Sequence, residues 1–176
     1  CLVANTDWYL YNFRLALAKE MRSLGWEVVM ISPTGPSVPR FVEEGFQWVE
    51  WQVDRRGLSL GREFQSALHL AKIYKQEHPL IAHHFTVKPV LYGSLVAHIE
   101  KVPAIVNSIT WLGYIYLRTG WQGTVLRSLV KPIYRLAIKH RNVRVIFENK
   151  DDKKFFIKNH LVHETQTTVV EGVGVD

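Results

Sequence analysis

The chain has 176 residues, of which 47% are hydrophobic and 22% are charged. This composition excludes an intrinsically disordered chain and is typical of one globular domain of ordinary size. No apolar run is long enough to cross a bilayer, no signal peptide is recognisable, and the single cysteine, Cys1, favours a reducing compartment. We therefore expect a cytoplasmic protein.

The formal net charge of +6 is concentrated between Arg118 and Arg144, a segment that contains no Asp or Glu. Within it, cations recur every fourth residue and share one stripe of a predicted helix over about 124–140. These cations are Arg127, Lys131, Arg135 and Lys139. A basic amphipathic helix favours peripheral contact with an anionic membrane on its inner face. An ordinary packed helix with a solvated outer face is the alternative. We expect no nucleic-acid binding, because only Tyr134 adds an aromatic ring among these cations.

The first elements are a short strand and a long helix. Residues 2–4 are apolar, and over 8–24 apolar residues recur at helical spacing. Thr6 or Asp7 can cap the start of this helix, and Gly25 can end it.

Further apolar segments alternate with helical patterns along the rest of the chain. The remaining predicted strands are 26–33, 47–53, 80–84, 103–109, 143–148 and 167–172. The remaining predicted helices are 37–46, about 60–78, 90–98, about 124–140 and 151–159. This alternation predicts an α/β fold, a doubly wound, mostly parallel sheet of about seven strands with helices on both faces. We expect residues 1–176 to form a single domain.

Polar residues follow nearly every predicted strand. In open α/β sheets, ligands bind outside the carboxyl ends of the strands, so these residues predict a polar crevice. Lys88 stands near the start of a predicted helix, where exposed N–H groups favour an anionic ligand. The alternative is that the polar strand ends simply meet water, and His83 suits a core position equally well.

Several sharper motifs are missing from the sequence. No glycine-rich dinucleotide fingerprint, P-loop or nucleophile elbow follows a predicted strand. The histidines show no zinc-binding spacing. We therefore expect no cofactor and no metal.

Segments along nearly the whole chain, taken in order, resemble the amino-terminal domain of family 4-like glycosyltransferases of bacteria. The segments are WYLYNFRLALAKEMRSLGWEVVMISP, VDRRGLS, HHFTVKPVLYGSLVA, VNSITWLGYIY, RVIFENKDDKKFFI and VVEGVGVD. The resemblance implies one Rossmann-like half of a GT-B enzyme, the half that binds the acceptor. It places the donor-binding half in a carboxyl-terminal domain outside this chain, so we expect this chain alone to be inactive.

The reaction implied by the resemblance is metal-independent transfer of a sugar with retention of its anomeric configuration. We expect a hexosyl or N-acetylhexosaminyl group to move from a UDP-linked nucleotide-sugar to a glycan or lipid-linked acceptor. Such a reaction would belong to the assembly of surface polysaccharides or glycans.

The resemblance also assigns residues to the cleft by position. The acceptor side takes Asn5, Thr6, Asp7, Trp8 and Arg14, and the middle takes His84, Thr86 and Lys88. The reacting centre takes Thr110, Trp111, Leu112 and Gly113. The crevice between the domains takes Glu148, Asn149 and Lys150, and the hinge takes Glu171 and Gly172.

Two of these residues are the candidate catalytic residues, Thr110 and His84. Many relatives carry a histidine at the end of the fifth strand, whereas this chain has Thr110. A threonine hydroxyl is a poor general base, so its role would be hydrogen bonding. We expect Lys88 and His84, with the following helix start, to bind a diphosphate.

Two other functions remain open. A nucleotide-sugar 2-epimerase of GT-B fold would need carboxylates placed for proton abstraction, where the fourth strand ends in histidine and lysine. A non-catalytic module that binds a membrane surface through the basic segment is the second alternative.

Overall fold

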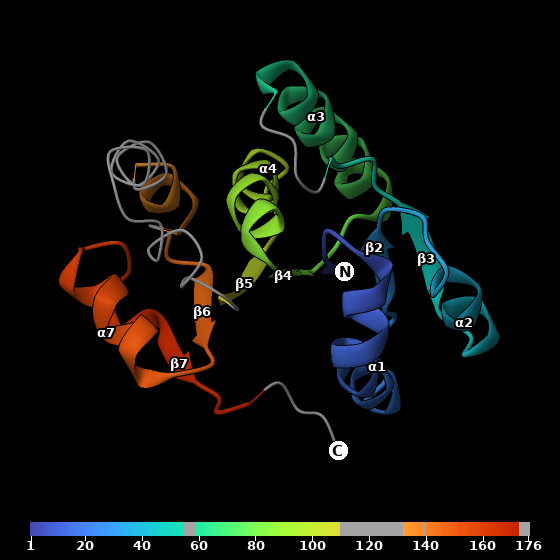
Figure 1. The fold of residues 1–176 in the computed structure, drawn as a ribbon, viewed down its shortest axis with the longest axis horizontal. Helices are drawn as coiled ribbons and strands as arrows, with labels where there is room; N and C mark the ends of the chain where they lie inside the picture. Colours follow the sequence, from blue (N-terminus) through green and yellow to red (C-terminus); the bar gives the residue numbers. More distant parts are fainter. Residues whose placement is uncertain (55–58, 110–131, 139, 173–176) are drawn as a thin grey trace.

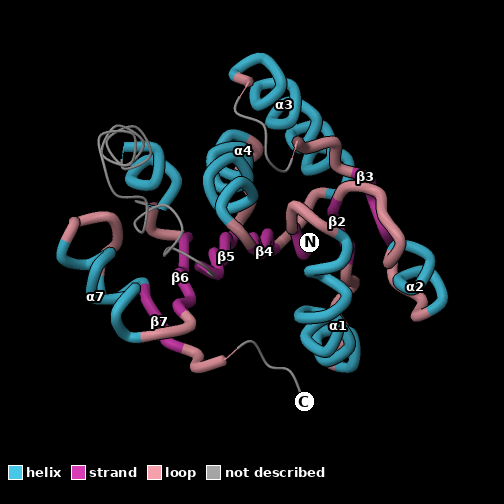
Figure 2. The backbone as a smooth tube through the Cα atoms, in the orientation of Figure 1, coloured by secondary structure: helices cyan, strands magenta, loops and turns pink. Residues whose placement is uncertain are grey.

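The computed structural model describes residues 1–54, 59–109, 132–138 and 140–172. Its strands form one sheet in the order β3-β2-β1-β4-β5-β6-β7, and every neighbouring pair is parallel (Figure 2). Their bounds are β1 Leu2–Val3, β2 Val29–Ser32, β3 Gln47–Glu50, β4 Ile81–Phe85, β5 Ala104–Ile109, β6 Val143–Phe147 and β7 Thr167–Val169. The prediction of a doubly wound, seven-stranded parallel sheet is confirmed.

Helices cover both faces of the sheet (Figure 1). A separate apolar core lies under each layer. The first layer contains α1 (Asp7–Ser23) and α2 (Val38–Glu43). The second contains α3 (Leu60–Glu77), α4 (Ser94–Ile99), the helical segment 132–138 and α7 (Lys150–Lys158). A π-helical turn, Pro89–Gly93, leads into α4.

Local sequence signals set the ends of the first helix as predicted. The Thr6 hydroxyl accepts a hydrogen bond from the Tyr9 N–H, which satisfies one of the free donors at the helix start. Gly25 follows the helix with a φ of +88°, a left-handed conformation that glycine adopts without steric cost.

The strand order changes direction between β1 and β4. From β1, the chain adds β2 and β3 on one side, then crosses over and adds β4 to β7 on the other. Loops at the carboxyl ends of the two strands diverge at such a switch point, and the space between them is the usual ligand site of doubly wound sheets. Topology therefore directs attention to the residues that follow β1 and β4.

Candidate functional site

The two histidines of β4 lie on opposite faces of the sheet, because side chains alternate along a strand. His84 faces the layer of α3 and α4 and is fully buried. The Tyr74 hydroxyl lies 2.7 Å from its Nε2 and Asn107 Oδ1 lies 2.9 Å from its Nδ1. Since Oδ1 only accepts, Nδ1 carries the proton and Nε2 accepts from Tyr74.

This placement corrects the expectation that His84 lines the crevice. Burial lowers the pKa of His84 to about 4, so the ring is neutral at physiological pH. The ring also packs against the π-helical turn, where a Cβ added at Gly93 would lie 2.6 Å from it. His84 therefore joins the strand to its helices and has no contact with solvent.

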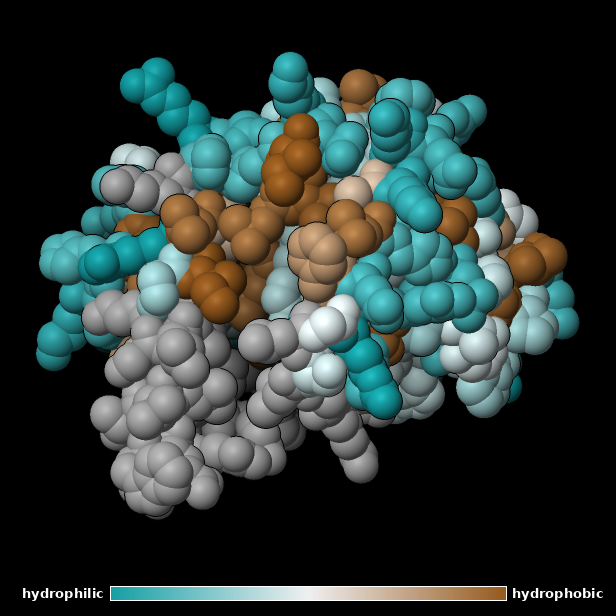
Figure 3. Space-filling model, turned by 90° about the horizontal axis from the view of Figure 1, so that it is seen from above, coloured by the Kyte–Doolittle hydropathy of each residue, from teal (hydrophilic) through white to brown (hydrophobic). Residues whose placement is uncertain are grey.

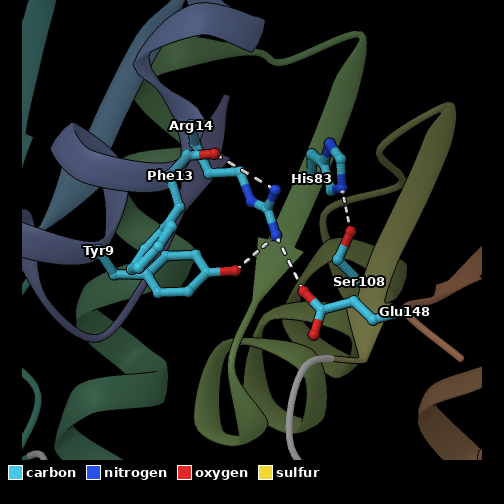
Figure 4. A network of polar contacts seen from close by, with 6 residues as sticks. All are labelled: Tyr9, Phe13, Arg14, His83, Ser108 and Glu148. Carbon is cyan, nitrogen blue, oxygen red and sulfur yellow. Dashed lines mark hydrogen bonds and ion pairs between the residues drawn. The ribbon is translucent and has the colours of Figure 1, made fainter. Parts of the chain in front are cut away.

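Arg14, on α1, occupies the opposite side of the β4 end. Its guanidinium donates to the Tyr9 hydroxyl at 2.6 Å (Figure 4). The guanidinium lies 4.7 Å from the centre of the Phe85 ring. It also pairs with Glu148 Oε1, at the carboxyl end of β6, at 3.5 Å. The pair joins residues 134 positions apart in the sequence. We call Tyr9, Arg14, Phe85 and Glu148, together with the neighbouring His83 and Ser108, the Arg14 cluster.

His83 is the histidine that faces this cluster. Its Nε2 lies 2.8 Å from Ser108 Oγ on β5 (Figure 4). Its ring centre lies 4.1 Å from that of Phe85. Burial holds the pKa of His83 well below its usual value, and the nearby His84 and Arg14 lower it further. A neutral imidazole beside a hydroxyl can orient a ligand hydroxyl, but it carries no charge for an anion.

Glu148 is the acidic member of the Arg14 cluster. Burial raises its pKa above the ordinary value, although Arg14 acts in the opposite direction. Its side chain is 22% exposed, compared with 12% for Arg14, so solvent and ligands reach both groups. The Arg14 cluster thus presents a cation, a carboxylate, a hydroxyl and a neutral imidazole at one place.

Lys88 lies on the other side of the β4 end, facing α3. Its ammonium forms an ion pair with Glu63 at 2.5 Å and donates to the Asp54 carbonyl oxygen. Both charged side chains are about nine-tenths buried. This pairing corrects the expectation that Lys88 binds a diphosphate, because the Glu63 carboxylate already neutralises the ammonium within the fold.

Thr86 stands between β4 and Lys88 in an unusual conformation. Its φ is +69°, which is rare for a β-branched residue, and its hydroxyl is buried without a hydrogen-bond partner. The Tyr92 hydroxyl, on the π-helical turn, has a pKa raised to about 12 by burial and by Glu63. Strained backbone and π-helical turns both concentrate at functional sites. We call Asp54, Glu63, Thr86, Lys88 and Tyr92 the Lys88 cluster.

Three predicted site residues use their side chains to shape loops. Thr6 caps α1, and Asp7 is buried and accepts a hydrogen bond from the Ser37 N–H at 2.7 Å. Asn149 caps α7 by accepting from the Asp152 N–H at 2.7 Å. Their groups are engaged within the chain, so their contribution to a site is to fix the loops around it.

The remaining predicted site residues lie nearer the surface. Asn5 is half-buried, and Trp8 is 56% exposed at the start of α1. Lys150 and Glu171 form an exposed ion pair at 3.6 Å, and Gly172 follows with a φ of +87°. The structure does not bring these residues into the Arg14 cluster.

Some predicted residues lie outside the described residues: Thr110, Trp111, Leu112, Gly113, Arg127, Lys131 and Lys139. The described member of the basic stripe, Arg135, is exposed and donates to the carbonyl oxygens of Asn159 and His160 at 3.4 and 3.3 Å.

Sequence reasoning missed Tyr9, Glu63 and Ser108. Ser108 had a signal, since it interrupts an otherwise apolar strand run, and its hydroxyl needs a partner when buried. No feature of the sequence indicated Glu63 or Tyr9, because their positions fit ordinary helix patterns. Only the fold brings these two residues to the strand ends.

A family model described as Glycosyl transferase 4-like matches residues 1–149, most of the chain. The chain belongs to this glycosyltransferase family. No curated protein is similar enough in sequence to count as a match.

Solved glycosyltransferase structures share the fold of this family member. A glycosyltransferase from Rickettsia africae is 16% identical with a TM-score of 0.68, and Anabaena HepE, solved with UDP and glucose, is 14% identical with a TM-score of 0.64. Acinetobacter baumannii MurG is 14% identical with a TM-score of 0.59. Each match covers 97% of this chain but only 41 to 44% of the other chain. The chain thus spans less than half the length of the glycosyltransferases it resembles.

No three His, Cys, Asp or Glu side chains converge as metal ligands within the described residues. In the same parts of the chain, no helix is both long and apolar enough to cross a membrane.

Proposed function

We propose that this chain is the acceptor-binding half of a retaining GT-B glycosyltransferase. The main support is the family match over residues 1–149. In addition, the structural similarity covers nearly all of this chain and less than half of each glycosyltransferase compared. On this proposal residues 1–176 form one domain, and a donor-binding domain completes the enzyme. The chain by itself is expected to be inactive.

The Arg14 cluster is the part of the site that the acceptor contacts. Arg14 supplies donors, Glu148 supplies acceptors, and the neutral His83–Ser108 pair can orient a hydroxyl in either sense. This mixture of donors and acceptors fits a sugar, whose hydroxyls do both. Thr110 remains the proposed hydrogen-bonding residue at the reacting centre, and His84 no longer has a catalytic role in the proposal.

The donor proposed is a UDP-linked hexose or N-acetylhexosamine. It is supported by the UDP and glucose named with the HepE structure. The acceptor proposed is a glycan or a lipid-linked sugar in the assembly of surface polysaccharides.

We further propose that the enzyme works in the cytoplasm, in peripheral contact with the inner face of the membrane. Figure 3 views the α3 and α4 side, where hydrophobic surface gathers. Exposed apolar side chains on the helices of this layer are Phe64, Leu68, Ile99 and Leu136. Leu136 adjoins Arg135, and apolar groups beside cations favour an anionic lipid surface.

The test uses the complete protein encoded by the source gene, incubated with UDP-sugars and glycan acceptors. The proposal expects a product whose anomeric configuration, read from the proton coupling at C1, matches that of the donor. Arg14→Gln should lower kcat/KM by about tenfold, or about 1.4 kcal/mol, whereas Arg141→Gln at an exposed site should not. Inversion, or an epimerised nucleotide-sugar without transfer, would refute the proposal.

A further inference from the structure

A polar hollow lies at the carboxyl ends of β2 and β3, beside the Lys88 cluster. Its volume is about 330 Å³, within the range of small-ligand sites, which is roughly 300–1,000 Å³. The loops after β2 and β3 form one wall, and α3 forms the other. Its polar lining includes Thr34, Glu50, Asp54, Arg62, Gln65 and His69.

The hydrogen-bonding groups of this hollow are oriented by the fold. The Gln52 N–H donates to His69 Nδ1 at 3.2 Å. Since Nδ1 accepts, the proton of a neutral His69 lies on Nε2, which makes Nε2 a donor. The exposed Gln65 amide adds a donor and an acceptor, and Thr34 adds a hydroxyl.

The charge of the described lining favours a neutral ligand. Among the described residues that line the hollow, two carboxylates, Glu50 and Asp54, accompany one guanidinium, Arg62, which already pairs with Asp54 at 3.3 Å. Uncharged hydroxyl groups can donate to these carboxylates and accept from the amide and imidazole.

Asp54 connects the hollow to the strained end of β4. Its carboxylate lies in the wall of the hollow, and its carbonyl oxygen accepts from the Lys88 ammonium. Glu63 and Thr86 lie beyond Lys88. One carboxylate oxygen of Glu63 and the hydroxyl of Thr86 are buried without a hydrogen-bond partner. Such unsatisfied groups are rare in folded proteins and mark places where a partner is missing.

We propose that this hollow is an outer acceptor subsite, which binds a neutral sugar ring next to the ring that reacts. The inference rests on the proposed function in naming the acceptor as a glycan of at least two sugars. It adds the class of group bound, a polyhydroxylated uncharged ring, and the residues that bind it, chiefly Gln65 and His69.

Binding by the isolated chain tests the subsite without any catalysis. Saturation-transfer NMR would be recorded with maltose, cellobiose, lactose and N,N′-diacetylchitobiose, and inorganic pyrophosphate would then be added as an anionic competitor. We expect saturation transfer from the protein to at least one disaccharide, little displacement by pyrophosphate, and binding about fivefold to tenfold weaker in His69→Asn, which keeps the acceptor used by Gln52 and removes the Nε2 donor. Gln65→Trp, on the exposed surface of α3, should fill the hollow and weaken binding similarly.

The matched control is His78→Asn, at the other end of the same helix. His78 has a φ of +45°, a left-handed conformation that asparagine tolerates, so this variant should bind the disaccharide like the wild type. No saturation transfer to any disaccharide, displacement of the disaccharide by equimolar pyrophosphate, or unchanged binding in both hollow variants would overturn the proposal.

Kinetics of the complete protein separate this inference from the proposed function. Gln65→Trp should raise KM for a disaccharide acceptor by about tenfold and leave a monosaccharide acceptor unaffected. If the enzyme transfers sugar but this KM is unchanged, the subsite is refuted and the function stands. If no sugar is transferred while the chain still binds the disaccharide in the hollow, the function is refuted and the hollow remains a binding site for a neutral sugar.

Discussion

At the scale of single residues, Arg14 is held by more than its ion pair. The Phe85 ring and the Tyr9 hydroxyl position the guanidinium, whereas Glu148 contacts it at 3.5 Å, long for a charge-assisted hydrogen bond. Burial outweighs this contact and leaves the pKa of Glu148 raised. Glu148 can therefore leave Arg14 and contact a ligand group instead, while Phe85 and Tyr9 keep Arg14 in place.

The raised pKa predicts a pH-dependent stability for Glu148→Gln. Because the folded-state pKa lies above the unfolded value, the stabilisation from a protonated Glu148 is complete below the unfolded pKa and is lost as pH rises through the folded pKa. The variant should thus gain stability relative to the wild type as the pH rises above the ordinary glutamate pKa of 4.5, and the gain is small because the group is partly exposed.

Urea denaturation at several pH values measures this difference. Glu27→Gln, at an exposed position, provides the control for the substitution itself. If the difference in unfolding free energy between Glu148→Gln and wild type does not change with pH, burial does not raise the pKa of Glu148.

His84 should behave as a core residue. His84→Leu leaves the Tyr74 hydroxyl without its buried partner, whereas Asn107 Oδ1 keeps its hydrogen bond from Ser94, so the change should cost about 1–3 kcal/mol of unfolding free energy. Per folded molecule, kcat/KM of the complete enzyme should stay within about threefold of wild type. Denaturation and active-site-normalised kinetics measure the two effects, and a loss of activity in a stable variant would restore a catalytic role.

The two histidines show how far sequence can reach at this scale. The pattern of a short apolar run ending in His83 and His84 placed both at a carboxyl strand end, which is correct. It could not say which ring faced which layer, because a buried strand has apolar residues on both faces and no alternation to read. For the same reason Lys88 looked like a free cation until α3 brought Glu63 against it.

At the scale of elements, the ends of helices were the most predictable features. Thr6 before α1 and Gly25 after it act as the sequence indicates, because capping depends on local geometry. The π-helical turn at Pro89–Gly93 was not predictable from local sequence, and it places Gly93 directly against the His84 ring, a contact between residues on different elements.

Asn149 tests whether a predicted site residue acts through its element. Asn149→Ala removes the cap of α7 and should cost about 1 kcal/mol of unfolding free energy, whereas Asn149→Asp keeps an acceptor and should cost much less. Thermal or urea denaturation measures both variants. Equal stability of Asn149→Ala and wild type would show that the Asn149 side chain does not stabilise α7 by capping it.

At the scale of the whole molecule, the alternation of strands and helices was enough to predict the fold class. Right-handed crossovers predicted a doubly wound sheet but not the order of its strands. The switch point between β1 and β4 is known only from the structure. That switch point explains why residues of α1, β4, β5 and β6 meet in the Arg14 cluster, a convergence that no local pattern contains.

The central claim is that this chain recognises the acceptor and leaves the nucleotide-sugar to another domain. The most direct measurement is a titration of the isotopically labelled chain, followed by NMR, with UDP-glucose and in parallel with neutral disaccharides. The account predicts that disaccharides shift signals of residues at the carboxyl ends of β3 to β6, and that UDP-glucose shifts none of them. Saturable binding of UDP-glucose at these strand ends, without binding of any disaccharide, would contradict it.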